Sequence, residues 1–509
     1  MPRVALGQRK RAYRPKTRTG CNTCKIKCDE ALPYCLKCIS TGRKCEGFEP
    51  QSHGNFIGSD IANISPQTLI RSPSIGFLGS EKERRSFHFF KQRTAAQLSS
   101  FFGGDFWERL LLQTTHHEPS VRHAIIALGA LHERFEQDNG LVVQSDAKGW
   151  TDDFALKNYN QAIKLLNQSL SSKGQQAIDT MQGSYGPAIT HVQSGMKILC
   201  EAQNGQLQNF GLETSAIPYV PMEMLEELFM RLDLQVTQMV GEGGKWQIYK
   251  VMKKYAWTRK IPPFFSSLSQ ARDSLVFHWH MLSYSISDVR GPTNEQIPDV
   301  FKAWQKSSIG ILEKWSAALN TFLFNRGDDL TDIERKGVAV LTILKELGST
   351  SVMLTRTMVD DQKAWDIFTP TFQRIVSLAE EIVELEYKSN SGRPTFSIDM
   401  AIVGPIFEVS CRCRDPLIRR RAITLLQTCG RTEGVWNSLL ASKVAQRVLE
   451  IEEAGLTGIR TYEDIPDWAR ISDITPVFDH VGRKATLTYS RPGTKHSLAR
   501  KTVQEVIEW

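Results

Sequence analysis

The sequence predicts a mainly α-helical protein with a small cysteine-rich module at its N-terminus. Six of the ten cysteines fall within residues 21–45. Residues 48–80 are rich in Gly, Pro, Ser and Asn and carry little charge, which is typical of a flexible linker. Beyond Glu81, apolar residues recur every three or four positions, which is the period of an amphipathic helix. We therefore expect a large all-helical domain over residues 81–460, followed by a C-terminal tail over 461–509.

The net charge of +8 is concentrated at one end of the chain. Residues 1–50 carry 12 Lys and Arg against 4 Asp and Glu, whereas the remaining residues hold equal numbers of basic and acidic side chains. Clustered cations bind polyanions well, because each neutralised phosphate releases counterions. A basic arm over residues 1–20, attached to a neutral body, therefore predicts polyanion binding, with a solvated basic tail as the alternative.

The basic arm also argues against secretion. It lacks the apolar stretch that a secretory signal requires, and no later segment reaches eighteen uninterrupted apolar residues, so no membrane span is expected. The run Arg9-Lys10-Arg11 fits nuclear import, with a charged disordered tail as the alternative. We expect a nuclear location, in a reducing compartment where clustered cysteines more often bind metal than form disulfides.

The clustered cysteines form two similar halves in tandem. They are Cys21, Cys24, Cys28, Cys35, Cys38 and Cys45. The two-residue spacing that opens each half lets two thiolates converge on one tetrahedral zinc. Six thiolates cannot give two zincs four ligands each unless two of them bridge, so the pattern implies a binuclear centre or one zinc with spare ligands. Redox use of the cysteine pairs is the less favoured alternative. Because the segment has almost no apolar core, metal binding must supply its folding free energy.

The stretch from Thr19 to Phe48 resembles the fungal zinc binuclear cluster domain. The shared motifs are Lys27-Cys28-Asp29-Glu30, Pro33 before Cys35, and Gly42-Arg43-Lys44-Cys45. The resemblance places the module at residues 21–47 and implies two zinc ions bridged by Cys21 and Cys35. It further implies that Cys24 and Cys28 complete one zinc site, and that Cys38 and Cys45 complete the other.

The same resemblance implies how the module would use double-stranded DNA. Members of the family place the end of a short helix in the major groove and read a CGG-type triplet there. By match, Lys25 and Lys27 would contact bases. The implied phosphate contacts are Arg18, Lys37, Arg43 and Lys44.

The spacing departs from the family at one place. Cys24 and Cys28 are separated by three residues, where the family usually has six, and the missing turn carries the family's base-contacting residues. A continuous helix would separate Cys21 from Cys28 by roughly 10 Å, at about 1.5 Å per residue. Thiolates bound to one zinc lie much closer, so the chain must leave the helix after Cys24. The short link threatens DNA reading more than zinc binding, and an aberrant gene model or splice form is an alternative explanation.

Four amphipathic helices can be read residue by residue in the large region. The first opens at Pro119, the second follows Asp152-Asp153, the third opens at Pro187, and the fourth lies near residue 445. Their apolar faces are formed in turn by Val121, Ile125, Leu128, Leu131 and Phe135; by Leu156, Tyr159, Ile163, Leu166 and Leu170; by Ile189, Val192, Met196 and Leu199; and by Leu440, Val444, Val448 and Ile451. They indicate stacked helical hairpins.

Strand and coiled-coil signals are weak by comparison. No run of alternating strands is found in the large region, and only residues 485–489, before a turn at Pro492-Gly493, favour a short strand. No sustained heptads follow the cysteines, so no dimerisation zipper is expected.

The large region resembles the fungal-specific transcription factor domain that commonly follows such clusters. The resemblance rests on residues 86–133 and 411–453. It implies a helical regulatory domain with no shared catalytic residues, so an enzyme is not expected. Between Ser172 and Gln182, where the family tends to carry another apolar helix, this chain is short and polar.

Several motifs that suggest other chemistry are better explained structurally. The histidines of His116-His117-Glu118, His123 and His132 do not form a His-Glu-x-x-His pattern. Residues 241–245 resemble a phosphate loop but have Trp246 where Ser or Thr is needed. Cys411 and Cys413 are expected to be buried structural thiols. The run Arg419-Arg420-Arg421 fits a solvated helix face, with binding of an acidic partner as the alternative.

Together these observations predict a mainly α protein with a zinc-stabilised N-terminal cluster module, a flexible linker and a large all-α regulatory domain. The expected function is a nuclear, zinc-dependent, sequence-specific DNA-binding transcription regulator. Double-stranded DNA is the expected partner, followed by co-regulators or the transcription machinery, and a homodimer is compatible with the sequence. The alternative is an interaction protein, derived from such a regulator, that reads DNA poorly.

Overall fold

The computed structural model describes most of the chain beyond residue 78. The described residues are 38, 40–41, 79–138, 153–169, 192, 194–196, 198–199, 220–240, 259–289, 298–327, 329–354, 361–390, 392–479, 484–492 and 500–508. The chain divides into two compact units, Met1–Gly76 and Phe77–Trp509. Nearly all described residues belong to the second, which we call the helical unit.

The helical unit begins where the sequence predicts. Helix α2 (Glu81–Phe89) is started by a capping box, in which Ser80 Oγ accepts from the backbone N–H of Glu83 and the Glu83 carboxylate accepts from the N–H of Ser80. The chain continues through π-helical and short α-helical turns. They are η2 (Phe90–Thr94), α3 (Ala95–Ser99), η3 (Asp105–Leu110) and α4 (Leu111–Thr114).

The first two predicted amphipathic helices are confirmed. Helix α5 (Pro119–Gln137) has Pro119 in its first turn, and its predicted face is buried from Ile125 to Phe135. Helix α6 (Asp153–Ser169) starts at the predicted acidic pair and packs against α5 through the buried Tyr159 and the partly buried Leu156 and Ile163. Leu170 and the side chain of Leu166, the rest of this predicted face, lie outside the description. Of the third predicted helix, Val192, Met196 and Leu199 are described, and all three are helical and buried, while Pro187 and Ile189 lie outside the described residues.

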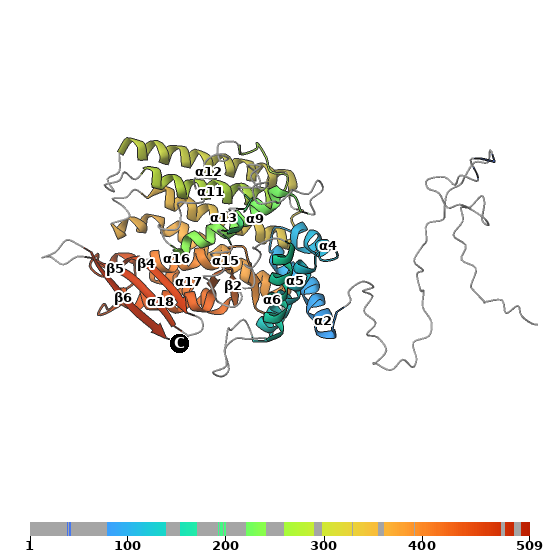
Figure 1. The fold of residues 1–509 in the computed structure, drawn as a ribbon. Helices are drawn as coiled ribbons and strands as arrows, with labels where there is room; N and C mark the ends of the chain where they lie inside the picture. The colour runs from blue at the N-terminus through green and yellow to red at the C-terminus, as the bar shows by residue number, and fades with distance from the viewer. Residues whose placement is uncertain are drawn as a thin grey trace, which may run out of the picture. The chain divides into compact units, whose positions relative to one another are not determined.

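Long helices build the middle of the unit. They are α9 (Met222–Val240), α11 (Leu268–Val289), α12 (Pro298–Arg326) and α13 (Asp332–Met353). Helix α11 contacts the other three, and Figure 1 shows α12, α11 and α13 stacked on one side of the unit. The fully buried Trp315 of α12 donates from its indole nitrogen to the Ala271 carbonyl of α11 at 2.9 Å.

The C-terminal helices close the opposite side of the main core. They are η6 (Gln362–Phe368), α15 (Thr369–Asn390), α16 (Val403–Arg412), α17 (Pro416–Thr428), α18 (Ser438–Glu453) and η7 (Tyr462–Asp464). The fourth predicted helix is confirmed as α18, because Leu440, Val444, Val448 and Ile451 are all buried in one cluster with α16 and α17. The described residues are therefore mainly helical, as predicted.

One small sheet departs from the predicted all-helical region, and a second sheet lies in the tail. In the first, β1 (Thr395–Ser397) runs parallel to β2 (Arg431–Glu433), which pairs antiparallel with β3 (Trp436–Asn437). Strands of two or three residues are too short to show an alternating pattern, which explains why the sequence did not reveal them.

The second sheet is built from the tail. Strands β4 (Ser472–Asp479), β5 (Lys484–Arg491) and β6 (Lys501–Glu508) pair antiparallel in that order. The weak strand signal at residues 485–489 is thus confirmed within β5. Ala485, Leu487 and Tyr489 are buried in the main core, so the sheet packs on the helices, as Figure 1 shows beside α18. In the part of the chain that the structure describes, no helix is long and apolar enough to cross a membrane.

Candidate functional site

The predicted zinc and DNA residues lie almost entirely outside the described residues. Only Cys38 is described, and it is helical and fully buried. The hydroxyl of Thr41 donates to the Cys38 carbonyl at 3.2 Å. Outside the description lie the ligands Cys21, Cys24, Cys28, Cys35 and Cys45; the DNA contacts Arg18, Lys25, Lys27, Lys37, Arg43 and Lys44; and the import residues Arg9, Lys10 and Arg11. The other residues of the predicted zinc module are not described, so the ligand role of Cys38 stays a prediction.

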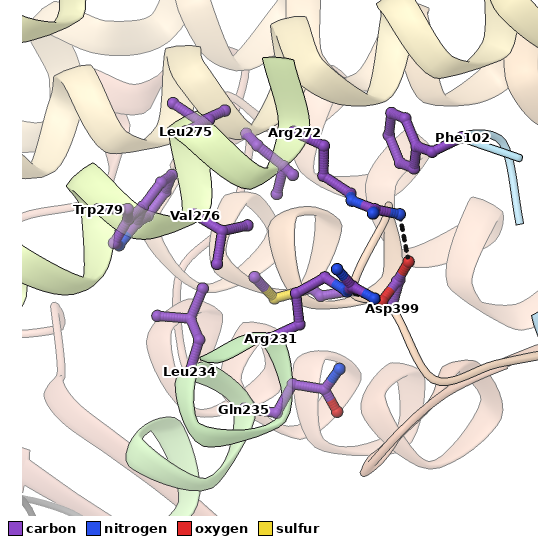
Figure 2. Close-up of a pocket in the computed structure, with 11 residues that line it drawn as sticks. Phe102, Arg231, Leu234, Gln235, Arg272, Leu275, Val276, Trp279 and Asp399 are labelled. Carbon is purple, nitrogen blue, oxygen red and sulfur yellow. Dashed lines mark hydrogen bonds and ion pairs between the residues drawn. The ribbon is translucent and has the colours of Figure 1, made fainter. Parts of the chain in front are cut away.

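The helical unit contains a small, partly open cavity of about 30 Å³, which is the scale of a single water. Figure 2 shows its walls: Leu234 and Gln235 from α9, Leu275, Val276 and Trp279 from α11, and Phe102 from the turn after α3. The walls are mostly apolar, but two arginines and an aspartate also line them.

With Asp273 of α11, these charged side chains form a cluster of two arginines and two aspartates that joins three segments of the chain. Arg231 of α9 donates to Asp399 at 2.8 Å and to Asp273 of α11 at 2.9 Å. Arg272 donates to the same two carboxylates, at 3.2 Å to Asp399 and 2.9 Å to Asp273. Figure 2 shows Arg231 and Arg272 reaching Asp399 from different helices. Burial opposes the charge on Arg272, but the carboxylates of Asp399 and Asp273 raise its pKa above the usual value.

Glu227 lies beside this cluster and titrates near neutrality. Burial raises its pKa to about 7, with a further contribution from the charge of Asp273. A carboxyl group with a raised pKa holds its proton in the folded state at pH values where the unfolded chain has lost it. Below the unfolded pKa of about 4.3, Glu227 is protonated in both states and does not lower the free energy of unfolding. Stability is lost as the pH rises towards 7.

We expect Glu227→Gln to raise the melting temperature at pH 8 by roughly 1–3 °C and to change it little at pH 5, because glutamine cannot take up the unfavourable charge. Thermal unfolding followed by circular dichroism at the two pH values measures the difference. Glu223→Gln, on an exposed position of the same helix, is the matched control. An equal change in melting temperature at pH 5 and pH 8 would contradict a raised pKa of Glu227.

The structural explanation of the histidines is confirmed for the two that are buried or partly buried. Burial lowers the pKa of His132 to about 3, with help from the positive charge of Arg93. The neutral ring lies 2.9 Å from the hydroxyl of Thr94 and 3.1 Å from the side-chain oxygen of Gln97. His123 lies 2.8 Å from Asn158 and so joins α5 to α6. No cluster of three or more His, Cys, Asp or Glu suited to a metal occurs among the described residues.

The downstream cysteines behave as predicted where they are described. Cys411 and Cys413 are buried in the main core, and burial raises the pKa of each thiol to about 12. Thiols with such values are unreactive, because the thiolate is the nucleophile. Cys200 and residues 241–245 lie outside the described residues.

The expectation of a solvated face for Arg419-Arg420-Arg421 is wrong at its first residue. Arg419 is fully buried and donates to Glu452 at 2.8 Å and to the Ser410 carbonyl at 2.9 Å. Arg420 and Arg421 are about half exposed and pair with Glu453 and Glu380. Successive residues of an α-helix point about 100° apart, so three in a row cannot share one face.

Sequence reasoning missed the charged cluster around Asp399. The only signal is a charged residue inside an apolar face, such as Arg231 between Met230 and Leu232. That signal shows that a partner is needed, but it does not identify Asp399, which is 168 positions away.

Comparison with known proteins gives one family match and several relatives. Residues 85–183, which begin within α2 and include α5 and α6, match the fungal specific transcription factor domain. The chain is 24% identical to an aspercryptin biosynthesis cluster-specific transcription regulator of Emericella nidulans, over 97% of this chain and 96% of that protein. That alignment covers 616 positions, more than the 509 residues here, so this chain lacks segments that the relative has.

Other relatives match over shorter stretches. A transcription regulator of Purpureocillium lilacinum is 28% identical over 35% of this chain and 47% of its own. A Zn(2)-C6 fungal-type transcription factor of Aspergillus fumigatus is 30% identical over 23% of this chain and 32% of its own. The chain therefore spans less than half the length of these two relatives. No solved structure matches it.

Proposed function

We propose that the protein is a nuclear, zinc-dependent transcription regulator of the RNA polymerase II type that binds DNA at CGG-like triplets. The six-cysteine pattern from Cys21 to Cys45, next to a basic arm, carries the proposal. The match of residues 85–183 to a fungal transcription factor domain supports it, as do relatives named as transcription regulators. One of those relatives is named as a Zn(2)-C6 factor.

The chemistry of the cysteines fits two zinc ions. Thiolates are preferred zinc ligands, and two bridging cysteines, Cys21 and Cys35, give each zinc four ligands. Six thiolates and two zincs sum to about −2, so the first 50 residues keep a net positive charge of roughly six for phosphate contact. Lys25 and Lys27 then contact bases. The phosphate contacts are Arg18, Lys37, Arg43 and Lys44.

The second candidate is an interaction protein that descends from such a regulator and reads DNA poorly. Two observations favour it: only three residues separate Cys24 from Cys28, and this chain lacks segments that its Emericella relative has. In both candidates the helical unit governs activity or the choice of co-regulator. Catalytic turnover by the pure protein would support neither candidate.

The test uses the full chain with zinc. Native mass spectrometry counts the bound metal, and fluorescence anisotropy compares a CGG-containing duplex with a scrambled one at two salt concentrations. We expect two zincs and a preference for CGG of at least about a thousandfold, the usual lower ratio of specific to non-specific affinity. Lys27→Ala should remove the preference, whereas Lys306→Ala, on an exposed position of α12, should not.

The two candidates give different results in this test. Salt-sensitive binding that is equal for both duplexes reports only the phosphate contacts of the basic arm, and it would support the second candidate. Inserting three residues between Cys24 and Cys28 should then create a CGG preference. If insertion changes nothing, the short link does not explain the loss of DNA reading.

A further inference from the structure

A second, open hollow lies elsewhere in the helical unit, between α3, the start of α13, the end of α15 and the first sheet. Its volume is about 240 Å³, room for a small molecule of several non-hydrogen atoms. Its charged lining consists of Arg93, Lys336, Arg431 and Glu386. The cations thus outnumber the carboxylates, although none of the relatives' names and none of the sequence motifs points to this place.

Arg431 is fixed by two carboxylates, but one of its guanidinium nitrogens has no hydrogen-bond partner. It is 1% exposed, and its Nε donates to Glu433 at 2.8 Å while its Nη1 pairs with Glu386. Glu433 is itself fixed, because it accepts from the backbone N–H groups of Ala401 and Val403 at 2.8 and 3.0 Å. The remaining nitrogen of Arg431, Nη2, is buried without a hydrogen-bond acceptor.

Lys336 is a largely buried residue that forms no ion pair with a carboxylate of the described residues. Its side chain, from the second turn of α13, is 8% exposed and lines the same hollow. Among the described residues its ammonium has one close electrostatic contact, the ring of Phe101 at 5.8 Å. The guanidinium of Arg431 lies 5.5 Å from the same ring. Arg93, by contrast, is paired with Glu136 at 3.0 Å.

Arg431 has a buried donor without an acceptor, and Lys336 has a charge without an ion pair at the wall of the open hollow. A buried charge is expected to be paired, and buried donors are expected to be hydrogen-bonded. A carboxylate or phosphate group in the hollow supplies what is missing, because each is an acceptor with negative charge. The existing carboxylate, Glu386, pairs with Arg431, and no ion pair joins it to Lys336 among the described residues.

We propose that this hollow binds a small anionic molecule through a carboxylate or phosphate group, with Lys336 as its principal donor and Arg431 as a second positive charge. The size and openness of the hollow fit a metabolite-sized ligand that exchanges with solvent. The site is independent of the proposed zinc module, so it can exist whether or not the protein reads DNA.

The test measures anion binding to the full chain by isothermal titration calorimetry in chloride buffer. Inorganic phosphate and succinate are titrated separately into wild type, Lys336→Met, Lys336→Arg and Lys345→Met. We expect at least one anion to bind wild type, with about tenfold or greater loss in Lys336→Met, because a charged hydrogen bond is removed. Lys336→Arg keeps the charge and should keep measurable binding. Lys345→Met, on the same helix and paired with Glu346, should bind like wild type.

Thermal unfolding of the same proteins separates loss of a ligand site from misfolding. Without added anion, Lys336→Met should melt at or above the temperature of wild type, since it removes a charge that has no ion pair. Phosphate or succinate should raise the melting temperature of wild type and Lys345→Met, raise that of Lys336→Arg to a smaller extent, and leave that of Lys336→Met unchanged. Tighter binding of succinate would indicate a carboxylate ligand, and tighter binding of phosphate would indicate a phosphate ligand. Equal binding by wild type and Lys336→Met would place binding elsewhere, for example on the basic arm, and overturn the proposal. No binding of either anion at about 10 mM would also overturn it.

Discussion

Replacing Glu452 with Gln is expected to lower the free energy of unfolding of the helical unit by about 3–5 kcal/mol, the usual cost of removing one partner from a buried ion pair. Glu452 of α18 is fully buried between Arg414 and Arg419, each of which donates to it at 2.8 Å. It also accepts from the backbone N–H of Ile471 at 2.9 Å, just before β4. One carboxylate thus holds two helix segments and the tail sheet together.

The charge of Glu452 explains the size of the effect. Burial opposes ionisation, but Arg414 and Arg419 outweigh it and hold the pKa of Glu452 below its usual value. Its stabilising contribution is therefore present above the unfolded pKa of about 4.3 and is lost as the pH falls through the folded value. Glutamine keeps the shape but leaves both arginines as uncompensated charges in the core.

Urea denaturation at pH 7 measures this change from the shift of the midpoint at constant slope. Glu450→Gln is the matched control, since its side chain is half exposed and pairs with Arg447 at the surface. We expect the control to stay within about 0.5 kcal/mol of wild type. A Glu452→Gln protein as stable as the control would show that the two arginines find other acceptors.

The helices with a clear apolar period could be predicted from the sequence, and the reason is local. Pro119 in the first turn and residues spaced three or four apart define α5, and the same spacing defines α18. Burial of those faces follows from the hydrophobic effect alone. The short strands β1 to β3 carry no such period, and they exist because α15 to α18 bring Thr395 and Arg431 side by side.

The buried charges could not be predicted, because their partners are distant in sequence. Arg431 and Lys336 approach Phe101 across more than 200 positions, and nothing near any of the three residues indicates that approach. Arg419 was predicted to be exposed because of its neighbours in the sequence. Its two neighbours are also arginines, and the three together resemble a surface run, although helix geometry turns only the first into the core.

Replacing Cys35 with Ser is expected to remove both zinc ions and to weaken binding to a CGG duplex by at least about a thousandfold, down to the non-specific level. The family resemblance makes Cys35 a bridging ligand, so its loss leaves each zinc with three thiolates. Structural zinc contributes about 10–16 kcal/mol of apparent binding free energy to small domains of this kind. A segment with so few apolar residues has no other source of comparable folding energy.

Cys429→Ser is the matched control, because Cys429 is a half-buried residue of the helical unit whose thiol makes a long contact, 3.9 Å, to the Leu426 carbonyl. It should keep the zinc count and the DNA affinity of wild type. The urea unfolding of the helical unit should be unchanged in Cys35→Ser, since the described core clusters that build this unit contain no cysteine except Cys411 and Cys413.

Loss of CGG binding together with an intact helical unit would tie DNA reading to the metal. Retention of two zincs by Cys35→Ser would mean that other cysteines bridge them, and a single zinc in wild type would mean that the three-residue link prevents a binuclear centre.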